Sequence, residues 1–320
     1  MKLTVLIPTY RRPKDLVRCL EALQKQTRPA DEVLVVVRNT DAETWEFLEA
    51  FKPEPLPMRT VTVKVTGVVA AMNAGLDTAQ GDIIAITDDD AAAHSDWLAH
   101  LETHYLADDR VGGVGGRDWL YNGKQLENGA REVVGRVQWF GRLIGNHHLG
   151  MGEPREVDVL KGVNSSYRRS ALANLRFDQR LLGTGAQIHN ELGLCLALRR
   201  AGWKLIYDPA AAVDHYLGER FYEDQRKQCF NGVAFMHIVH NETLVLLEHL
   251  PPAQRVAFLM WAILVGTRDS LGFVQLLRLL PSEGGLAAQK WLASVRGRWQ
   301  GWLTWQQSHR EVLAKQSQAL

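Results

Sequence analysis

The sequence predicts an α/β protein whose N-terminal half is a doubly wound sheet. Short apolar segments rich in β-branched residues alternate with segments whose apolar residues recur at helical spacing. Because each predicted helix returns the chain to the same end of the sheet, the alternation favours parallel strands and right-handed crossovers. The last apolar segment ends in three consecutive carboxylates, Asp88, Asp89 and Asp90. Ligands of such sheets bind over the carboxyl ends of the strands, so this position predicts the functional site.

The expected elements follow one another along the chain. Strands are predicted at residues 3–7, 33–37, 60–65 and 83–86, and helices at residues 14–26, 42–51 and 68–79. Leucines at helical spacing support the first helix, and Pro8 ends the first strand. Further along, residues 192–201 predict a helix, and residues 204–207 predict a strand that ends in a turn at Asp208-Pro209.

Composition limits the class of protein. The chain has 320 residues, of which 46% are hydrophobic, so it can bury the core of one large domain with an appendage. Its formal net charge of +1 gives no general attraction for nucleic acid, and no nucleic-acid partner is expected. Cys19, Cys195 and Cys229 lack metal-ligand spacing and indicate a reduced, intracellular protein. The N-terminus lacks the apolar length of a signal peptide, so we expect a cytoplasmic location, including the inner face of the cell membrane.

Three adjacent carboxylates at the end of a buried strand leave two interpretations open. Side by side they repel one another and resist burial, unless a cation neutralises them. Mg²⁺ and Mn²⁺ prefer carboxylate oxygens and bridge readily to phosphates, which predicts a divalent metal site. Alternatively, the acids cap a helix that begins at the three alanines of residues 91–93.

Several short motifs resemble those of the family-two inverting glycosyltransferases, which have a GT-A fold. The motifs are Ile7-Pro-Thr-Tyr10, Ala71-Met-Asn73-Ala-Gly75, Thr87-Asp-Asp-Asp90, Lys161-Gly-Val-Asn164, Asn190-Glu191 and Asp214-His215. They keep the family's order over roughly the first 220 residues. The resemblance implies transfer of a sugar from a nucleoside diphosphate donor to a hydroxyl acceptor, with inversion at the anomeric carbon and with Mn²⁺ or Mg²⁺ as cofactor.

The resemblance also assigns roles to positions in this chain. Asp88 is expected to face the ribose of the donor, and Asp89 to support its neighbours. His215 is expected to contact the metal or the diphosphate, although a lone histidine is more often structural. Tyr10 is expected to frame the nucleobase, or else to be an ordinary surface aromatic. The full set expected at the donor is Pro8, Thr9, Tyr10, Arg11, Arg38, Asn73, Asp88 and Asp89, with Asp90 and His215 as metal ligands.

Glu191 is the predicted general base. The family usually has Glu-Asp at this place, whereas this chain has Asn190-Glu191 and keeps one carboxylate in front of a helix. A carboxylate held beside the donor can deprotonate the acceptor hydroxyl. The alternative is an acid that only stabilises the helix N-terminus. If Glu191 were not the base, Asp178 or Asp214 would be the next candidates.

The acceptor region is predicted within residues 111–162, where polar and aromatic groups can stack on sugars and bind their hydroxyls. Trp119, Trp139 and Asn164 are expected to contact the acceptor, a glycan or a lipid-linked glycan. Four glycines within residues 112–116 permit close backbone approach to a ligand, or mark bulges in a strand.

Two departures from the family leave the nucleobase open. Where the family typically has an acidic pair that binds uracil, this chain has Arg38, so that contact is absent or displaced to Asp41. Met72 stands where an arginine often precedes the asparagine, which removes a cation unless Arg38 or Lys64 replaces it. A polar segment further on either closes over the phosphates or is a solvated loop, and it contains Arg220, Tyr222 and Arg226.

Two domains are predicted, at residues 1–243 and 244–320. The first is the glycosyltransferase domain, with a donor half at residues 1–110 and an acceptor half at residues 111–243. The second is an amphipathic helical region whose apolar segments are shorter than a bilayer span. Its tryptophans, interleaved with basic residues, indicate peripheral membrane contact, or else a helical subdomain that packs on the catalytic core or on a second subunit of a homo-oligomer.

The resulting prediction is a metal-dependent, inverting, hexosyltransferase-like enzyme that adds a single sugar in polysaccharide or surface glycan biosynthesis. It is expected to be non-processive, because Val295 stands where processive synthases have a glutamine before Arg-Trp. Two alternatives remain. A nucleotidyltransferase would need a basic glycine-rich loop near the first strand, where only Arg11 and Arg12 stand. A catalytically silent glycan-binding or scaffold protein would not need Glu191 or the acidic triplet.

Overall fold

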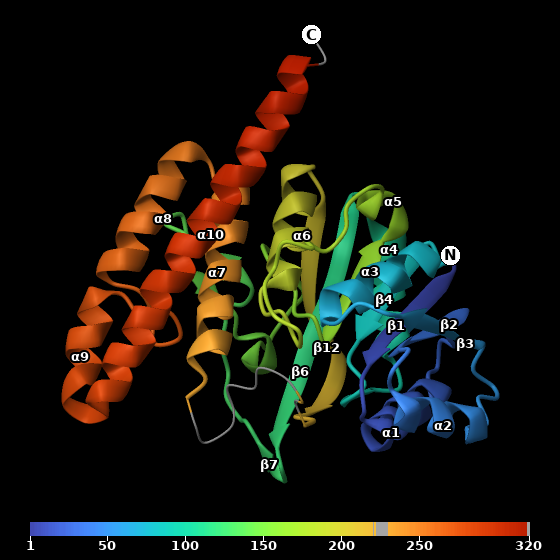
Figure 1. Cartoon of the computed structure of the whole chain (residues 1–320). Helices are drawn as coiled ribbons and strands as arrows, with labels where there is room; N and C mark the ends of the chain where they lie inside the picture. Colours follow the sequence, from blue (N-terminus) through green and yellow to red (C-terminus); the bar gives the residue numbers. More distant parts are fainter. Residues whose placement is uncertain (220, 222–229, 319–320) are drawn as a thin grey trace. The chain divides into compact units, whose positions relative to one another are not determined.

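The computed structural model describes residues 1–219, 221 and 230–318 (Figure 1). The chain divides into two compact units. The first consists of Met1–Arg136, Leu143–Phe177 and Leu194–Glu219, and the second of Val137–Arg142, Asp178–Gly193 and Arg220–Leu320. Among the described residues, no helix combines the length and the apolar character needed to cross a membrane. The predicted phosphate-closing residues Arg220, Tyr222 and Arg226, and also Cys229, lie outside the described residues.

The first unit is built on a ten-stranded mixed sheet. Its strands are β1 (Leu3–Thr9), β2 (Glu32–Arg38), β3 (Met58–Val63), β4 (Ile83–Thr87), β5 (Ala91–Ala93), β6 (Val111–Asn122), β7 (Gln125–Leu126), β10 (Arg155–Val157), β11 (Asn164–Arg168) and β12 (Lys204–Tyr216). The strand order is β10-β12-β6-β11-β4-β1-β2-β3, with β5 beside β12 and β7 beside β6. β1 to β4 pair in parallel, whereas β11 is antiparallel to both β4 and β6. The predicted α/β class with a mixed sheet is confirmed.

Helices cover both faces of the parallel part of the sheet. They are α1 (Pro13–Gln24), α2 (Ala42–Ala50), α3 (Val68–Thr78), α4 (Trp97–Ala107) and the short α5 (Arg169–Leu172). Successive residues of a strand point to opposite faces. Val5 and Ile7 of β1 belong to the core cluster that contains the apolar residues of α1 and α4. Leu6 points the other way, to α3, where a Cβ on Gly75 would overlap the leucine side chain.

The smaller elements lie in the second half of the chain. α6 (Asn190–Arg200) begins in the second unit and ends in the first. The remaining short elements are β8 (Arg136–Val137), β9 (Leu143–Ile144) and the 3₁₀ helix η1 (His147–Leu149). The helix expected at residues 192–201 is therefore confirmed as α6, with a slightly earlier start.

β12 does not end at Asp208-Pro209, where the sequence predicts a turn. The strand continues to Tyr216, and its register against β6 shifts between Asp208 and Val213. Proline lacks the N–H that a strand ladder uses, so a bulge is a position that accepts it. The predicted turn is wrong, because the proline interrupts the ladder without ending the strand.

This bulge explains one glycine of β6. A Cβ on Gly116 would overlap the carbonyl group of Ala211, which lies in the bulged part of β12. Gly116 therefore lies opposite a bulge and permits the two strands to approach closely. Of the two interpretations of the glycine-rich segment, this supports the one in which the glycines mark bulges. Beyond the bulge, the register pairs Asp118 with Val213 and His215 with Leu120. The bulge thus sets the alignment of the polar ends of β6 and β12.

The second unit is dominated by helices α7 (Gly232–His249), α8 (Pro252–Leu264), α9 (Phe273–Glu283) and α10 (Gly285–Gln318), coloured orange to red in Figure 1. This confirms the predicted C-terminal helical region. Its core cluster includes Phe235 and Val239 of α7, Leu279 of α9 and Ala293 of α10. The expected boundary between residues 243 and 244 lies inside α7.

Replacing Gly116 by alanine is expected to destabilise the protein by roughly 1–3 kcal/mol or more, because the added methyl group meets the rigid backbone of Ala211. Thermal and urea unfolding will measure the loss. Gly145→Ala is the matched control, since a Cβ there has no atom within 4 Å. Equal stability of the two variants would contradict the role given to the bulge.

Candidate active site

The three carboxylates follow β4 and precede β5. Asp88 is half-buried, whereas Asp89 and Asp90 are buried. The alanines after them form β5, which pairs antiparallel with β12 and places Ala91 opposite His215. The interpretation of the acids as a cap for a helix at residues 91–93 is therefore wrong. Pairing with β12 determines the conformation of this segment, and it brings a histidine to the acids.

Arg12 compensates the buried negative charge. Its Nη2 lies 2.5 Å from Asp89 Oδ1, and its Nη1 lies 2.8 Å from Asp90 Oδ2. Asp89 also accepts a hydrogen bond of 2.7 Å from Thr9 Oγ1, and Asp90 accepts one of 2.9 Å from the Gly218 backbone N–H. Burial raises the pKa of the Asp89 carboxyl, and the Arg12 guanidinium opposes that rise. The pKa of Arg12 is itself raised, because the attraction of the three carboxylates outweighs its desolvation by burial.

His215 lies between two carboxylates. Its Nδ1 is 3.4 Å from Asp118 Oδ2, and its Nε2 is 3.6 Å from Asp90 Oδ1. In the tautomer whose Nδ1–H donates to Asp118, the lone pair on Nε2 faces Asp90. Asp118 is fully buried and also lies 3.3 Å from Lys161 Nζ. Burial acts to raise the pKa of Asp118, but Lys161 and His215 outweigh it and lower the pKa to about 2.

The arrangement fits a divalent cation. One ligand atom each from Asp88, Asp90 and His215 lie within 4.8 Å of one another. Ligands on opposite sides of an octahedral Mg²⁺ are about 4.2 Å apart, so small side-chain shifts would suffice. Asp90 Oδ1 is buried and accepts no hydrogen bond from the described residues, so this oxygen remains available to a cation. The structure thus brings together two predicted metal ligands, Asp90 and His215, and adds Asp88 to them.

Tyr10 and two arginines lie beside the end of β1. The Arg38 guanidinium is 5.3 Å from the centre of the Tyr10 ring, and that of Arg11 is 6.0 Å from it. Arg11 has a positive φ of 55°, and its N–H donates a hydrogen bond of 2.6 Å to Asp41. Pro8 is buried within β1 and pairs with Val36 of β2. The predicted donor residues of β1 and β2 therefore lie together.

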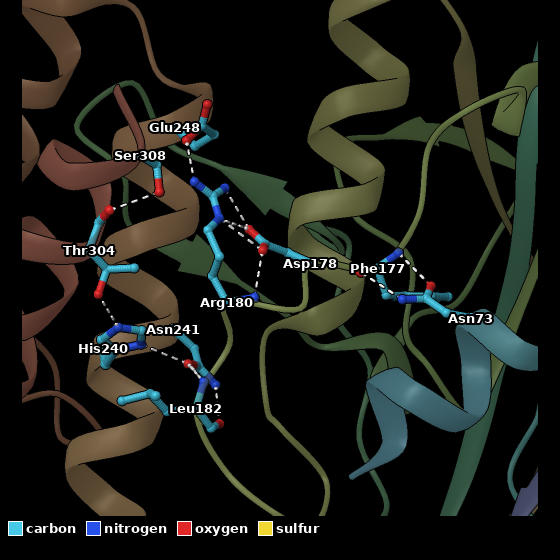
Figure 2. A network of polar contacts seen from close by, with 10 residues as sticks. All are labelled: Asn73, Phe177, Asp178, Arg180, Leu182, His240, Asn241, Glu248, Thr304 and Ser308. Carbon is cyan, nitrogen blue, oxygen red and sulfur yellow. Dashed lines mark hydrogen bonds and ion pairs between the residues drawn. The ribbon is translucent and has the colours of Figure 1, made fainter. Parts of the chain in front are cut away.

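Two polar residues of the predicted donor side are engaged inside the protein. Asn73 is buried and binds both the N–H and the carbonyl of Phe177, each at 2.9 Å (Figure 2). Asp41 caps α2 through Thr44 N–H and accepts the Arg11 N–H with its other oxygen. In this structure both side chains fix backbone segments, and Asp41 is 1% exposed with a hydrogen bond on each of its two oxygens.

The predicted acceptor residues have different surroundings. The Arg117 guanidinium lies 3.5 Å from the centre of the Trp119 ring, which is half-buried. Asn164 is fully buried, accepts a hydrogen bond from Trp97 Nε1 and donates two to the carbonyls of Arg117 and Ala211. Trp139 belongs to the second unit and is 68% exposed. The Asn164 side chain thus joins neighbouring segments of the sheet through hydrogen bonds. Trp119 and Trp139 both keep part of their apolar surface exposed to solvent.

Glu191 lies in the first turn of α6, in the second unit, and is half-buried. The backbone just before it is unusual, because Gln187 and His189 have positive φ values of 40° and 76°. Such conformations cost free energy in residues other than glycine, and they concentrate at functional sites.

Side chains of α7 hold the segment that leads to α6, as Figure 2 shows. Asn241 donates a hydrogen bond of 3.0 Å to the Leu182 carbonyl. It donates a second one, of 3.1 Å, to the Ile188 carbonyl, which the figure does not draw. Arg180 forms an ion pair of 2.7 Å with Asp178 and one of 3.3 Å with Glu248. Asp178, which is the first alternative to Glu191 as the general base, therefore forms an ion pair with an arginine.

Arg12, Asp118 and Lys161 are the residues whose roles sequence reasoning missed. Lys161 belongs to a motif, but nothing local in the sequence shows that Asp118 contacts a histidine 97 residues away. One feature of the sequence could have pointed to Arg12. Three carboxylates at the end of a buried strand need a positive charge close by, and a basic residue of the protein can supply it.

The chain is similar in sequence to known glycosyltransferases. The family model "Glycosyl transferase family 2" matches residues 4–176. A glucosyl-dolichyl phosphate glucuronosyltransferase of Haloferax volcanii is 26% identical over 229 residues, which cover 68% of this chain and 70% of the relative. The uncharacterized glycosyltransferase YwdF of Bacillus subtilis is 38% identical over 91 residues, which cover 28% of this chain and 33% of that protein.

Solved structures share the fold. S. aureus TarS in complex with UDP-GlcNAc aligns with a TM-score of 0.58 at 15% identity, over 96% of this chain and 92% of that one. GalNAc-T7 with UDP, GalNAc and Mn²⁺ aligns with a TM-score of 0.61 at 16% identity, over 77% of this chain and 48% of that one. At 15–16% sequence identity, these alignments show that this chain shares the fold of the two proteins and nothing beyond the fold.

Asp118→Asn is expected to weaken Mn²⁺ binding by about 10–100-fold, because an amide no longer holds the His215 ring through a charged hydrogen bond. Titration calorimetry with Mn²⁺ in the presence of UDP measures this. Asp214→Asn is the control, since Asp214 is next in sequence to His215 but contacts His94 instead. Unchanged Mn²⁺ affinity in Asp118→Asn would remove Asp118 from the site.

His147 gives the structure a pH-dependent contribution to stability. It is buried, its Nε2 lies 2.9 Å from the Val159 carbonyl oxygen, and burial lowers its pKa from 6.5 to about 4. The unfolded chain therefore binds a proton that the folded chain does not, and stability falls as the pH drops from 6.5 towards 4.

Between pH 7.5 and 5, this group is expected to remove roughly 2 kcal/mol of unfolding free energy. His147→Gln should lack this part of the loss, whereas replacing the exposed His309 by glutamine should retain it. Urea denaturation at the two pH values is the measurement. The same loss in His147→Gln as in the unaltered protein would contradict the assignment.

Proposed function

The chain belongs to glycosyl transferase family 2, and from this we propose that it is a metal-dependent, inverting enzyme that transfers a single sugar from a nucleoside diphosphate donor to a hydroxyl acceptor. The observation that carries the proposal is the group of ligand atoms from Asp88, Asp90 and His215 at the carboxyl end of a central strand. Parallel α/β sheets bind nucleotides at such edges.

Tyr10 with its two arginines is proposed to receive the nucleotide. An aromatic ring can stack on a base, and the Arg11 and Arg38 guanidinium groups favour phosphate or the base edge. UDP-sugars are the first donors to test, because two similar structures were obtained with UDP or UDP-GlcNAc. Asp41 is engaged elsewhere, so selectivity for uracil would have to come from other contacts.

Mg²⁺ or Mn²⁺ held by Asp88, Asp90 and His215 would neutralise the negative charge that grows on the departing diphosphate. The protein's own contribution is to keep these ligands in place. Arg12 holds the buried carboxylates together, and Asp118 orients the His215 ring.

Glu191 is proposed as the general base. It would take the proton of the acceptor hydroxyl while that oxygen bonds to the anomeric carbon and the bond to the diphosphate breaks. Attack opposite the leaving group inverts the anomeric centre. The strained backbone before Glu191 supports this role. The other candidates are less suited, because Asp178 contacts Arg180 and Asp214 contacts His94.

The acceptor is proposed to be a glycan or a lipid-linked glycan, in polysaccharide or surface glycan biosynthesis. The Haloferax volcanii relative is named for a dolichyl phosphate-linked substrate, which supports a lipid-linked acceptor. Trp119 and Trp139 are the side chains proposed to stack on its sugars. Addition of a single sugar is proposed because this chain has Val295 where processive synthases have a glutamine.

Two variants test whether binding and chemistry are separate. Asp90→Ala is expected to abolish the Mn²⁺-dependent thermal stabilisation by UDP, whereas Glu191→Gln should keep it. Glu191→Gln should lower turnover by about two to four orders of magnitude, because the amide cannot accept the proton. Turnover is measured as UDP release from UDP-sugars. Glu153→Ala, at an exposed acid, is the control for both measurements.

Retained Mn²⁺-dependent stabilisation in Asp90→Ala would rule out the metal assignment. Turnover of Glu191→Gln near that of the unaltered protein would leave Glu191 as a helix-terminal acid. If Glu191→Gln lost UDP binding as well, Glu191 would belong to the nucleotide site.

A further inference from the structure

Exposed apolar side chains concentrate on three helices of the second unit. Among the described residues, 13 of the 21 large hydrophobic side chains that are exposed lie from Val256 to Leu303, so their exposure is not scattered. α8 buries Phe258 and exposes Val256, Met260 and Ile263. These three follow one another at intervals of four and three residues, which places them in one stripe on the helix.

α9 repeats this pattern. It buries Leu279 in the core of the unit and exposes Phe273, Leu277 and Leu280. Their spacing of four and three residues again defines a single stripe, on the side of the helix away from the core. Val274 is also exposed beside this stripe, and Arg278 is exposed one turn further along the helix, so a cation lies at the margin that Val274 forms.

α10 is fixed to α7 by its glycine side. A Cβ on Gly297 would lie 2.5 Å from the Met236 carbonyl oxygen, so the two helices are in close contact there. The exposed residues Leu292, Val295 and Trp299 lie on the opposite side, since at about 100° per residue Trp299 is about 200° from Gly297.

The charges around these stripes are mainly positive. Residues 250–311 contain seven Lys and Arg against three Asp and Glu, and six of these cations remain when the buried Arg298 is left out, although the whole chain has a net charge of only +1. Arg278 on α9 and Arg296 on α10 are both exposed and adjoin the stripes. Apolar stripes bordered by arginine and tryptophan are typical of helices that lie in the headgroup region of a bilayer.

We propose that the stripes of α8, α9 and α10 form a membrane-binding surface for bilayers that contain anionic lipids. The apolar side chains would enter the boundary between headgroups and acyl chains, while Arg278 and Arg296 bind lipid phosphates. A second copy of the chain fits this surface less well. A two-fold dimer uses the same patch on both partners, and it would bring the arginines of one copy towards those of the other.

Vesicle flotation of the full chain tests the proposal. The protein is expected to float with phosphatidylcholine vesicles that contain roughly 30 mol% phosphatidylglycerol, to bind pure phosphatidylcholine more weakly, and to dissociate as salt is raised. Leu277→Glu and Trp299→Glu should each reduce binding at least tenfold. The matched control is Leu106→Glu on α4, where the leucine is 68% exposed outside the surface, and its binding should be unchanged.

Charge reversal tests whether the arginines beside the stripes contribute to binding. Arg296→Glu should reduce the preference for anionic vesicles, whereas Arg110→Glu, at a side chain that is 74% exposed in the first unit, should not. The Mn²⁺-dependent stabilisation by UDP, measured on every variant, should persist, which separates this proposal from the proposed glycosyl transfer.

Two results would overturn the proposal. One is failure of the unaltered protein to bind either kind of vesicle. The other is a dimer in light scattering that Leu277→Glu converts to a monomer while vesicle binding is unaffected by that change, because a second copy of the chain would then cover the surface.

Discussion

The negative charge at the end of β4 is the constraint on which the site depends. Asp89 is fully buried beside Asp90, and removing the partner of a buried charge typically costs about 3–5 kcal/mol. Arg12 meets both carboxylates, so its position must be fixed. It is the N-cap residue of α1, its carbonyl accepts hydrogen bonds from Asp15 and Leu16, and Pro13 begins the helix. The turn from β1 to α1 is therefore as much a part of the site as the acids are.

The same constraint extends to two more strands, β12 and β6. From Arg12 the contacts run through Asp90 and His215 to Asp118 and Lys161, so each acid lies between two basic groups. This alternation offsets part of the cost of burying Asp90 and Asp118, and among the described residues it leaves Asp90 Oδ1 without a hydrogen bond. It also requires β6 and β12 to be aligned, which the bulge opposite Gly116 achieves. The bulge, which ends two residues before His215, thus determines the position of the histidine.

Local periodicity predicted most of the first unit, because its strands and helices are decided by which residues can be buried. It was insufficient at residues 91–93, where alanines favour a helix and pairing with β12 imposes a strand. Periodicity also could not show that the side chains of Asn73 and Asp41 form hydrogen bonds with the protein's own backbone. Asp118 was missed because its partners are distant in sequence, whereas the acidic triplet was found because its members are adjacent.

The two units differ in the kind of surface they present, and this bears on how the proposed activities combine. The first unit contains the buried acids and the residues that could hold a metal, while the second carries the apolar stripes and the excess of positive charge. Binding to a bilayer would stabilise the ground state and the transition state equally, so it cannot accelerate sugar transfer itself. Its effect would be to confine the enzyme to the surface that holds a lipid-linked acceptor. Membrane binding should then lower the apparent KM for such an acceptor and leave kcat to the residues of the active site.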